Sequence, residues 1–491
     1  MICRLLIVFI LLSSCNNQTR KIDKLFIGGE PDLTKERISR VENGLQEAVL
    51  LSNNLDKTFS LLDRMEYYDV PGLSIAAIKD NEIEWAKCYG LKLKNSTDSI
   101  SLSTKFQAAS LSKPLSAIVA LKMADNGLIH LDSSANSQLT TWKIPDNDFT
   151  FENAISPRNL ILHTSGLNVP GYPGYKIDSD IPNLIDLLSG IGNSNTEPTE
   201  VIVKPNTEWI YSGAGYSVLQ LLMIEKSGLS FPELMQNELF QPLNIKNSTF
   251  EQENLHSIAF AHLENGEVVE KGYHIYPEMA AAGLWTTPID YAMIVCELQK
   301  SYKGESNLIL SQKLAQNALS NHWGGMGLGF ILRNNENNVA LAYSGGNHGY
   351  ICDIYSYLLS GSGVVVMTNS NNGAPLIEEF YRSLSKEYKW ADWKPDTIQT
   401  IPMDSALIKR IIGSYSGLSR DREEFQFELI KQPDGLYYKT RERKYPVFLI
   451  SDFEFLIPEQ DWRLSIFVDN FEIDSLKFRL EYGRGIARRN N

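Results

Sequence analysis

The residues best suited to covalent chemistry are a serine and a lysine three positions apart, Ser110 and Lys113. On a helix, side chains at this spacing share one face, with Cβ atoms roughly 5–6 Å apart. The amine could therefore reach the hydroxyl, and burial would lower its proton affinity so that it acts as a base. A serine at the start of a helix also lies where backbone N–H groups favour an oxyanion. The pair indicates a nucleophile beside its proton acceptor.

The same spacing occurs a second time, at Ser383 and Lys386. The helix predicted around this second pair, over residues 377–388, is rich in Glu and Arg, which indicates a solvent-facing surface. Small and apolar residues precede Ser110, and a largely apolar predicted helix over residues 115–126 follows it. We therefore assign the candidate chemistry to Ser110 and a structural role to Ser383.

Two other segments could supply partners for the serine. Tyr211 lies among small residues just before a strongly apolar predicted helix, and beside a lysine ammonium its phenol could titrate low enough to accept a proton. The alternative is a buried structural tyrosine. Residues 343–349, Tyr-Ser-Gly-Gly-Asn-His-Gly, follow a predicted strand, and such a strand edge lets a substrate approach and presents free N–H groups. The alternative there is an ordinary hairpin turn.

The elements that must position these residues alternate between strand and helix. Predicted strands cover residues 73–78, 83–89, 340–343, 351–358 and 363–367. Predicted helices cover residues 115–126, 217–226 and 377–388, and glycines follow the first two as C-terminal caps would. Strands at both ends of the region with helices between them favour an α+β or three-layer architecture.

The chain changes character after residue 393. Apolar and polar residues then alternate with period two in several short runs, separated by turns such as Pro433-Asp434-Gly435. This pattern predicts a small antiparallel barrel or sandwich of about 85 residues. We interpret residues 400–491 as a β-rich accessory domain; the alternative is a segment that merely packs against the main body.

The N-terminus has the three-part layout of an export signal: a positive charge at Arg4, an apolar run over residues 5–12, and small residues before Cys15. A cysteine at this place resembles a bacterial lipoprotein signal, which implies cleavage before Cys15 and lipid on its thiol. The alternatives are a plain secretory signal and a short anchor. We predict a signal peptide over 1–14, a polar tether over 15–44, and a lipid-anchored location in the cell envelope, at the periplasmic face or outer membrane.

Composition excludes several classes of protein. The 491 residues include 46 Lys and Arg against 59 Asp and Glu, a net charge of −13, which argues against nucleic-acid partners. The length suggests two or three domains, and no internal apolar run approaches a membrane span. The histidines lack metal-ligand spacing, and Cys88, Cys296 and Cys352 are too scattered for a zinc site or disulfide framework. We expect buried cysteines, no metal and no cofactor.

Together these motifs resemble the serine β-lactamase/penicillin-binding-protein-like hydrolases, whose class C-type branch includes esterases, D-aminopeptidases and D-alanyl-D-alanine carboxypeptidases. Ser110-x-x-Lys113 matches the nucleophile motif, Tyr211-Ser212-Gly213 stands where the family has Tyr-x-Asn, and Tyr343-Ser344-Gly345 stands where it has Lys-Thr-Gly or His-x-Gly. Residues 70–75, 159–167 and 279–287 also resemble the family. The similarity runs in the family's order from about residue 60 to residue 390.

The resemblance implies a β-lactamase/transpeptidase-like fold over residues 45–395: an antiparallel sheet with helices on both faces and a helical subdomain. It implies catalytic roles for Ser110, Lys113 and Tyr211. The residues implied for oxyanion and substrate binding are Ser110, Tyr343, Ser344, Gly345 and Gly346, with the oxyanion on the backbone N–H groups of Ser110 and Gly346. It implies a small-molecule or short peptide substrate, with the membrane reached through lipidated Cys15. We expect His163 to be structural.

Two departures from the family bear on activity. Gly213 replaces an Asn that holds substrate, and Tyr343 replaces a cationic donor for a substrate carboxylate. Both losses favour a loose esterase or amidase over an efficient β-lactamase or a strict carboxypeptidase; His348 is a candidate substitute donor. The alternative function is a catalytically degenerate member of the fold that acts as a binding or sensor protein. A weaker alternative is a structural lipoprotein that binds cell wall through residues 400–491.

Overall fold

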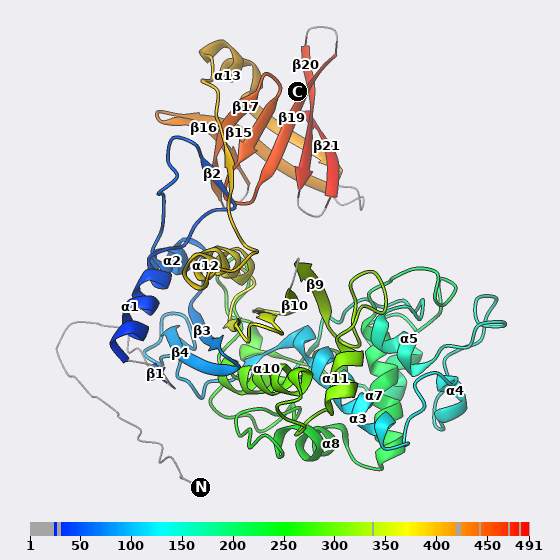
Figure 1. The fold of residues 1–491 in the computed structure, drawn as a ribbon. Helices are drawn as coiled ribbons and strands as arrows, with labels where there is room; N and C mark the ends of the chain where they lie inside the picture. The colour runs from blue at the N-terminus through cyan, green and yellow to red at the C-terminus, as the bar shows by residue number, and fades with distance from the viewer. Residues whose placement is uncertain are drawn as a thin grey trace.

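The computed structural model describes residues 24–26, 31–335, 338–418, 424–440, 443–469, 472–480 and 483–490. The predicted signal peptide and Cys15 lie outside these ranges. Figure 1 shows a mixed α+β main body and, above it, a β-barrel that carries the C-terminal end of the chain. The predicted fold class, a sheet with helices on both faces followed by a small all-β domain, is confirmed.

Among the described residues, seven antiparallel strands form the central sheet of the main body, in the order β1-β4-β3-β12-β11-β10-β9. Their bounds are β1 Lys24–Phe26, β3 Gly72–Lys79, β4 Glu82–Gly90, β9 Ile331–Asn335, β10 Asn338–Asn347, β11 Tyr350–Tyr357 and β12 Gly363–Thr368. The early hairpin and the three later strands predicted from the sequence are confirmed as β3–β4 and as β10, β11 and β12. The pairing of β3 with β12 joins the two ends of the region.

Both faces of the sheet are covered by helices (Figure 1). Along β3, Ile75 and Ala77 enter one hydrophobic core, and Ala76 and Ile78 enter the other. One core lies under α1 (Pro31–Glu42), α2 (Leu61–Tyr67) and α12 (Gly373–Tyr388), and α10 (Pro288–Lys303) packs on the opposite face. Because side chains alternate between two buried faces, β3 reads as a mostly apolar run.

Helix α1 lies inside the segment predicted as a polar tether, and for these residues the tether prediction is wrong. Ile38 and Val41 of α1 are buried against α12. Ser383 of α12 is also buried and donates a hydrogen bond to the Val41 carbonyl at 2.7 Å, while Lys386 is exposed. The structural assignment of Ser383 therefore agrees with its contacts, although its expected exposure does not, because a helix from the predicted tether covers it.

The helical subdomain lies beside the far end of the sheet (Figure 1). Its helices are α3 Ser112–Asp125, α4 Ala135–Gln138, α5 Pro157–Leu162, α6 Leu184–Ser189, α7 Gly213–Ser227, α8 Phe231–Met235, α9 Met279–Ala282 and α11 Gln312–Ala318. Short turns of helix cover Ala109–Leu111, Gln236–Phe240 and Glu270–Gly272. The predicted helices over 115–126 and 217–226 are confirmed as α3 and α7. Helix α7 begins at Ser212, whose side chain accepts from the Gly215 N–H, and ends at the left-handed Gly228.

Three two-stranded pairings tie distant segments together. They join β2 Val49–Leu51 to β13 Asp396–Ile398, β5 Phe106–Gln107 to β8 Trp285–Thr286, and β6 Tyr175–Lys176 to β7 His274–Ile275. The second pairing matters for the site, because β5 leads directly into the turn that carries Ser110. Cys88, Cys296 and Cys352 are buried, as expected.

The C-terminal domain is a closed antiparallel barrel preceded by α13 (Ser405–Ile411). The strands described are β14 Gly413–Leu418, β15 Glu424–Gln432, β16 Gly435–Lys439, β17 Lys444–Ser451, β18 Glu454–Ile457, β19 Trp462–Asp469, β20 Glu472–Leu480 and β21 Gly483–Arg489. Pairing of β14 with β21 closes the barrel. Alternate residues such as Phe427 and Leu429 fill its core, so the period-two pattern is confirmed.

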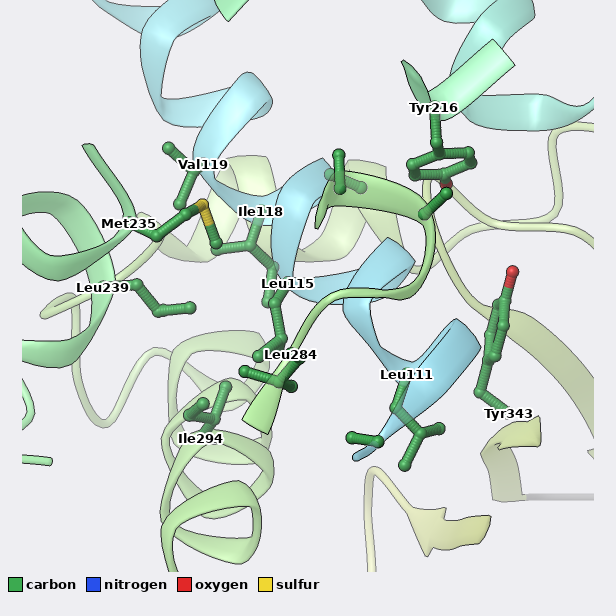
Figure 2. Close-up of a cluster of buried hydrophobic side chains, with 14 of the residues drawn as sticks. Leu111, Leu115, Ile118, Val119, Tyr216, Met235, Leu239, Leu284, Ile294 and Tyr343 are labelled. Carbon is green, nitrogen blue, oxygen red and sulfur yellow. The ribbon is translucent and has the colours of Figure 1, made fainter. Parts of the chain in front are cut away.

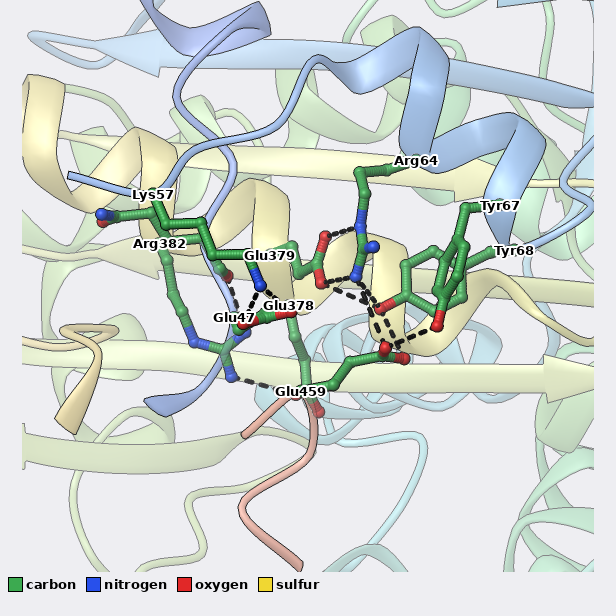
Figure 3. A network of polar contacts seen from close by, with 10 residues as sticks. Glu47, Lys57, Arg64, Tyr67, Tyr68, Glu378, Glu379, Arg382 and Glu459 are labelled. Atoms are coloured by element: carbon green, nitrogen blue, oxygen red, sulfur yellow. Dashed lines mark hydrogen bonds and ion pairs between the residues drawn. The ribbon is translucent and has the colours of Figure 1, made fainter. Parts of the chain in front are cut away.

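A buried polar network joins the barrel to the main body (Figure 3). Glu459, in the turn between β18 and β19, accepts hydrogen bonds from the phenols of Tyr67 and Tyr68 at 2.8 and 3.0 Å. Arg64 of α2 pairs with Glu379 of α12, its Nε 2.6 Å from a carboxylate oxygen. Arg64, Glu379 and Glu459 are almost fully buried. Removing Arg64 from this network would leave buried carboxyl groups without their compensating cation, a change that costs about 3–5 kcal/mol.

Candidate active site

Ser110 lies in a tight helical turn between β5 and α3 that several hydrogen bonds fix in place. The preceding residue, Ala109, has a positive φ of 49°, a conformation that non-glycine residues adopt only when their surroundings hold them there. The Ser112 hydroxyl donates to the Ala109 carbonyl at 2.6 Å and accepts from the Leu284 N–H at 3.0 Å. The turn therefore presents Ser110 at the entrance to α3, as a half-buried side chain.

Two polar side chains meet the Ser110 hydroxyl. The Lys113 Nζ donates to the Ser110 Oγ at 3.0 Å, and the Tyr211 phenol donates to the same oxygen at 2.9 Å. Lys113 is 2% exposed, and its ammonium also donates to the Ala281 carbonyl of α9 at 2.9 Å. The structure thus brings together the three residues for which the sequence predicted catalytic roles, although Tyr211 comes from 101 positions along the chain.

The surroundings of Tyr211 favour loss of its phenolic proton. Burial acts to raise the pKa of Tyr211, but the Lys113 ammonium and the hydrogen bonds around the phenol outweigh it, so the pKa lies below its ordinary value. The ammonium is 4.9 Å from the Tyr211 ring centroid. A phenol of lowered pKa in hydrogen-bond contact with a serine hydroxyl can accept the proton of that hydroxyl during attack.

His163 packs against the Tyr211 ring and accepts a hydrogen bond from the backbone of the next residue. Its ring lies 4.5 Å from the Tyr211 ring, centroid to centroid, and its Nδ1 accepts from the Ser212 N–H at 3.1 Å. Burial, helped by the nearby Lys113 charge, lowers the pKa of His163 to about 3, so the imidazole is neutral. The sequence prediction treated His163 as structural; the structure adds that it contacts the tyrosine at the site, which spacing along the chain could not show.

The end of β10 packs directly against the serine turn. A Cβ added at Gly345 would lie 2.3 Å from the Ala108 carbonyl oxygen and 3.1 Å from the Ser110 nitrogen, so only glycine allows this approach. At Gly346 the nearest atom would be in the Ile351 side chain at 3.3 Å. Among the described residues, β9 pairs with β10 only as far as Ala342, so no strand pairs with the outer edge of β10 beside Ser110.

The other two residues of this predicted motif face opposite sides of the sheet. Tyr343 is 3% exposed, and its phenol points toward Tyr216 in the core beside Leu111 (Figure 2). Burial raises the pKa of Tyr343 well above its ordinary range, so the residue is neutral. Ser344 is exposed on the other face, and its hydroxyl donates to the Asp353 carboxyl group. The cation that the resemblance leads one to look for at position 343 is thus replaced by a buried neutral ring.

A second aromatic ring occupies the space beside Gly213. A Cβ at Gly213 would lie 2.8 Å from the Tyr172 ring, and the Tyr172 phenol hydrogen-bonds with the Ser217 hydroxyl at 2.7 Å. A residue as large as Asn does not fit at 213 while Tyr172 stands there. Nothing in the sequence around Tyr172 signalled this, because the two segments lie about forty residues apart and meet only in the fold.

His348, the candidate substitute donor, supplies no positive charge at neutral pH. Its ring stacks on the His274 ring, with centroids 4.5 Å apart. Burial and the neighbouring His274 both lower the pKa of His348 below its ordinary value.

Glu278 is a buried acid that the sequence analysis missed. It immediately precedes α9, three residues before the Ala281 carbonyl that Lys113 contacts. Both carboxyl oxygens are buried and make no hydrogen bond to another residue among those described. Burial raises the pKa of Glu278 to about 8, so the group is largely protonated at neutral pH. Only its position beside the familial stretch 279–287 could have drawn attention to it.

Comparison with known proteins places this geometry in a family. Protein flp of Staphylococcus aureus strain MW2 is 27% identical over 238 residues, which are 46% of this chain and 44% of that protein, so the chain spans less than half of this relative's length. Penicillin-binding protein 4* of Bacillus subtilis strain 168 is 20% identical over 374 residues, which are 70% of this chain and 78% of that protein.

Solved structures agree on the fold. The octameric penicillin-binding protein homologue from Pyrococcus abyssi superposes with a TM-score of 0.60 at 19% identity, covering 87% of this chain and 98% of that one. The structure of SurE superposes with a TM-score of 0.52 at 15% identity, covering 87% and 97%. The family model described as Beta-lactamase matches residues 61–385, which include Ser110, Lys113, Tyr211 and the whole of β10. The chain therefore belongs to the β-lactamase family.

Proposed function

We propose that this protein is a serine hydrolase that forms an acyl-enzyme through Ser110 on an ester, amide or lactam carbonyl. One observation carries the proposal: the Lys113 ammonium and the Tyr211 phenol both contact the Ser110 Oγ, at 3.0 and 2.9 Å, while the serine itself stays half-exposed. A hydroxyl held by two such groups has both a route for its proton and access to a substrate.

The steps follow from these contacts. With Tyr211 deprotonated beside the Lys113 ammonium, the Ser110 Oγ attacks the carbonyl carbon while its proton moves to the Tyr211 oxygen. The backbone N–H groups of Ser110 and Gly346 stabilise the oxyanion; the close packing of Gly345 on the serine turn supports this role. As the tetrahedral intermediate collapses, the leaving group takes the proton and departs. Water then hydrolyses the Ser110 ester and restores the free hydroxyl.

The departures from the family favour ester or amide substrates without a strict carboxylate requirement. Tyr343 is buried and neutral, and Tyr172 fills the space beside Gly213, so two polar groups that hold substrate in relatives are replaced by rings. The same two positions support the second candidate, a catalytically degenerate binding or sensor protein. The intact contacts among Ser110, Lys113 and Tyr211 favour the hydrolase.

The experiment pairs labelling with turnover. A fluorophosphonate probe should add one adduct to the wild-type chain, located at Ser110 by peptide mass spectrometry. Hydrolysis of p-nitrophenyl acetate should fall at least about 10³-fold in Ser110→Ala and Lys113→Ala. The matched control is Ser383→Ala, which removes the serine of the second S-x-x-K pair. This variant should keep both labelling by the probe and hydrolysis of the ester. Labelling that persists in Ser110→Ala, or turnover unchanged in both variants, would refute the hydrolase.

We also propose a lipid anchor at Cys15 that holds the protein in the cell envelope, at the periplasmic face or outer membrane. Its support is the sequence: an apolar run followed by small residues and a cysteine. In the part of the chain that the structure describes, no helix has the length and apolarity of a bilayer span. Metabolic labelling with an alkyne-modified fatty acid should mark the wild-type protein and not Cys15→Ala; equal labelling would refute the anchor.

A further inference from the structure

A cavity of about 690 Å³ lies between the end of β10, β11 and α12. Its wall begins with Ser344, Gly345 and Gly346, the strand end that packs against the serine turn. Because β9 leaves this edge of β10 after Ala342, a substrate lying along the edge would reach Ser110 on one side and the cavity on the other. Gly345 thus borders both the cavity and the serine turn.

Two carboxyl groups in the cavity wall are held in place by phenols. The Tyr381 phenol donates to Asp353 at 2.6 Å, and the Ser344 hydroxyl donates to the second oxygen of the same carboxyl group. The Tyr355 phenol donates to Asp392 at 2.6 Å. Burial raises the pKa of Asp353 to about 7 despite these two hydrogen bonds, so the carboxyl group is about half ionised at neutral pH, and a cation bound beside it would favour its charged form.

Aromatic rings complete the wall. Trp393 packs edge-on against Tyr381 and Tyr355, with ring centroids 4.9 and 5.6 Å apart. Aromatic faces and carboxylates are together the usual means by which proteins bind an ammonium group. The cavity lining also contains Glu378, a further acid, which pairs with Arg382 at 3.3 Å. Arg333 of β9, a basic residue of the lining that would repel a cation, has an exposed side chain.

We propose that this cavity binds a positively charged group of the substrate, a primary or quaternary ammonium, while the scissile carbonyl lies at Ser110. This inference rests on the proposed hydrolase function and specifies its substrate class. Asp353 and Asp392 are the specificity-determining residues, with Trp393 as an aromatic wall. A substrate carboxylate at this place would face two carboxyl groups, and a neutral group would gain nothing from them.

The first test uses pairs of substrates that differ only in charge. Acetylthiocholine is compared with 3,3-dimethylbutyl thioacetate, which has carbon in place of the cationic nitrogen. The p-nitrophenyl ester of 4-(trimethylammonio)butanoate is compared with that of 5,5-dimethylhexanoate, so that the charge lies on the acyl side. In at least one pair, kcat/KM of the wild type should favour the cation about tenfold. Equal values in both pairs would overturn the proposal.

Substitutions in the cavity lining test whether the cavity causes the preference for the cationic substrate. Asp353→Asn and Asp392→Asn should each reduce the ratio of kcat/KM for the cationic ester to kcat/KM for the neutral ester severalfold, and Arg333→Ala should increase this ratio. The matched control is Glu152→Gln, an exposed acid remote from the cavity lining, which should leave the preference unchanged. A preference that survives in both aspartate variants would refute the assignment of the cavity.

A binding measurement separates this inference from the proposed function. Isothermal titration of the full-length Ser110→Ala protein with the cationic and neutral esters should give about tenfold tighter binding of the cation, lost in Ser110→Ala/Asp353→Asn. Charge-selective binding without turnover by the wild type would leave the cavity assignment standing and refute the hydrolase. Turnover without charge selectivity would support the hydrolase and refute the assignment of the cavity.

Discussion

Replacing Glu278 by Gln should stabilise the main body in a pH-dependent way. The folded protein raises the pKa of this carboxyl group from 4.5 to about 8, because burial disfavours its charge and no other described residue donates to it. The unfolded chain therefore ionises first. As the pH rises from 4.5 to 8, the folded state retains a proton that the unfolded state has lost, so stability falls across this window and levels off above it.

The magnitude follows from the size of the shift. At about 1.36 kcal/mol per pKa unit, the whole window corresponds to about 5 kcal/mol, and the part up to pH 7 to about 3 kcal/mol. Gln has the shape of the protonated acid and does not ionise. Relative to its difference from wild type at pH 4.5, Glu278→Gln should thus be more stable by about 3 kcal/mol at pH 7.

Thermal unfolding of the full chain measures this difference. At roughly 1.4 °C per kcal/mol for a main body of about 350 residues, the melting temperatures of Glu278→Gln and wild type should separate by about 4 °C between pH 4.5 and pH 7. Glu152→Gln, which changes an exposed acid in the same way, should show no such divergence. Parallel melting curves for Glu278→Gln and wild type across this range would show that the carboxyl group is solvated or paired, and would refute the reasoning.

Three further outcomes are expected. Gly345→Ala should lower kcat by at least about 10², because its methyl group would push β10 away from the serine turn, whereas Gly346→Ala should stay within severalfold of wild type; equal losses would contradict the packing argument. Tyr211→Phe should lower kcat/KM by about 10²–10⁴ and abolish the rise of activity with pH through the lowered pKa of that phenol; an unchanged pH profile would assign the proton to another group. Glu459→Ala should destabilise docking of the barrel by about 1–3 kcal/mol, because the Tyr67 phenol loses its acceptor while Arg64 stays paired with Glu379; an earlier, separate unfolding transition is expected, and a single unshifted transition would contradict the network.

The sequence predicted the elements that are buried over most of their surface. Strands β3 and β12 are buried on both faces, helices α3 and α7 are buried nearly all round, and each reads as a dense apolar run. The sequence did not predict helix α1, because its only buried apolar residues among those described are Ile38 and Val41, in a segment otherwise rich in charged residues. Two apolar residues one turn apart are enough to fix a helix on α12 and too few to distinguish it from a polar linker.

The residues of the candidate site also differ in whether the sequence alone could predict their contacts. Ser110 and Lys113 are three residues apart on one helical turn, so their meeting is dictated locally. Tyr211 could be proposed only by analogy, since 101 positions separate it from the serine. The residues that surround these three, such as His163, Tyr172 and Glu278, act through contacts that no spacing encodes. Their types are ordinary for a core, and only the fold shows that they border the site.

The charge distribution around β10 connects these observations. On the side of the strand that faces the serine, the cation expected at position 343 is a buried neutral tyrosine, which leaves Lys113 as the ammonium in contact with the hydroxyl. On the other side, Ser344 leads to Asp353 instead of to a basic group. A substrate carboxylate would therefore lose its partner on one face and meet a like charge on the other. Because the two changes lie on neighbouring residues that point in opposite directions, each face of the strand argues independently for the cationic substrate proposed above.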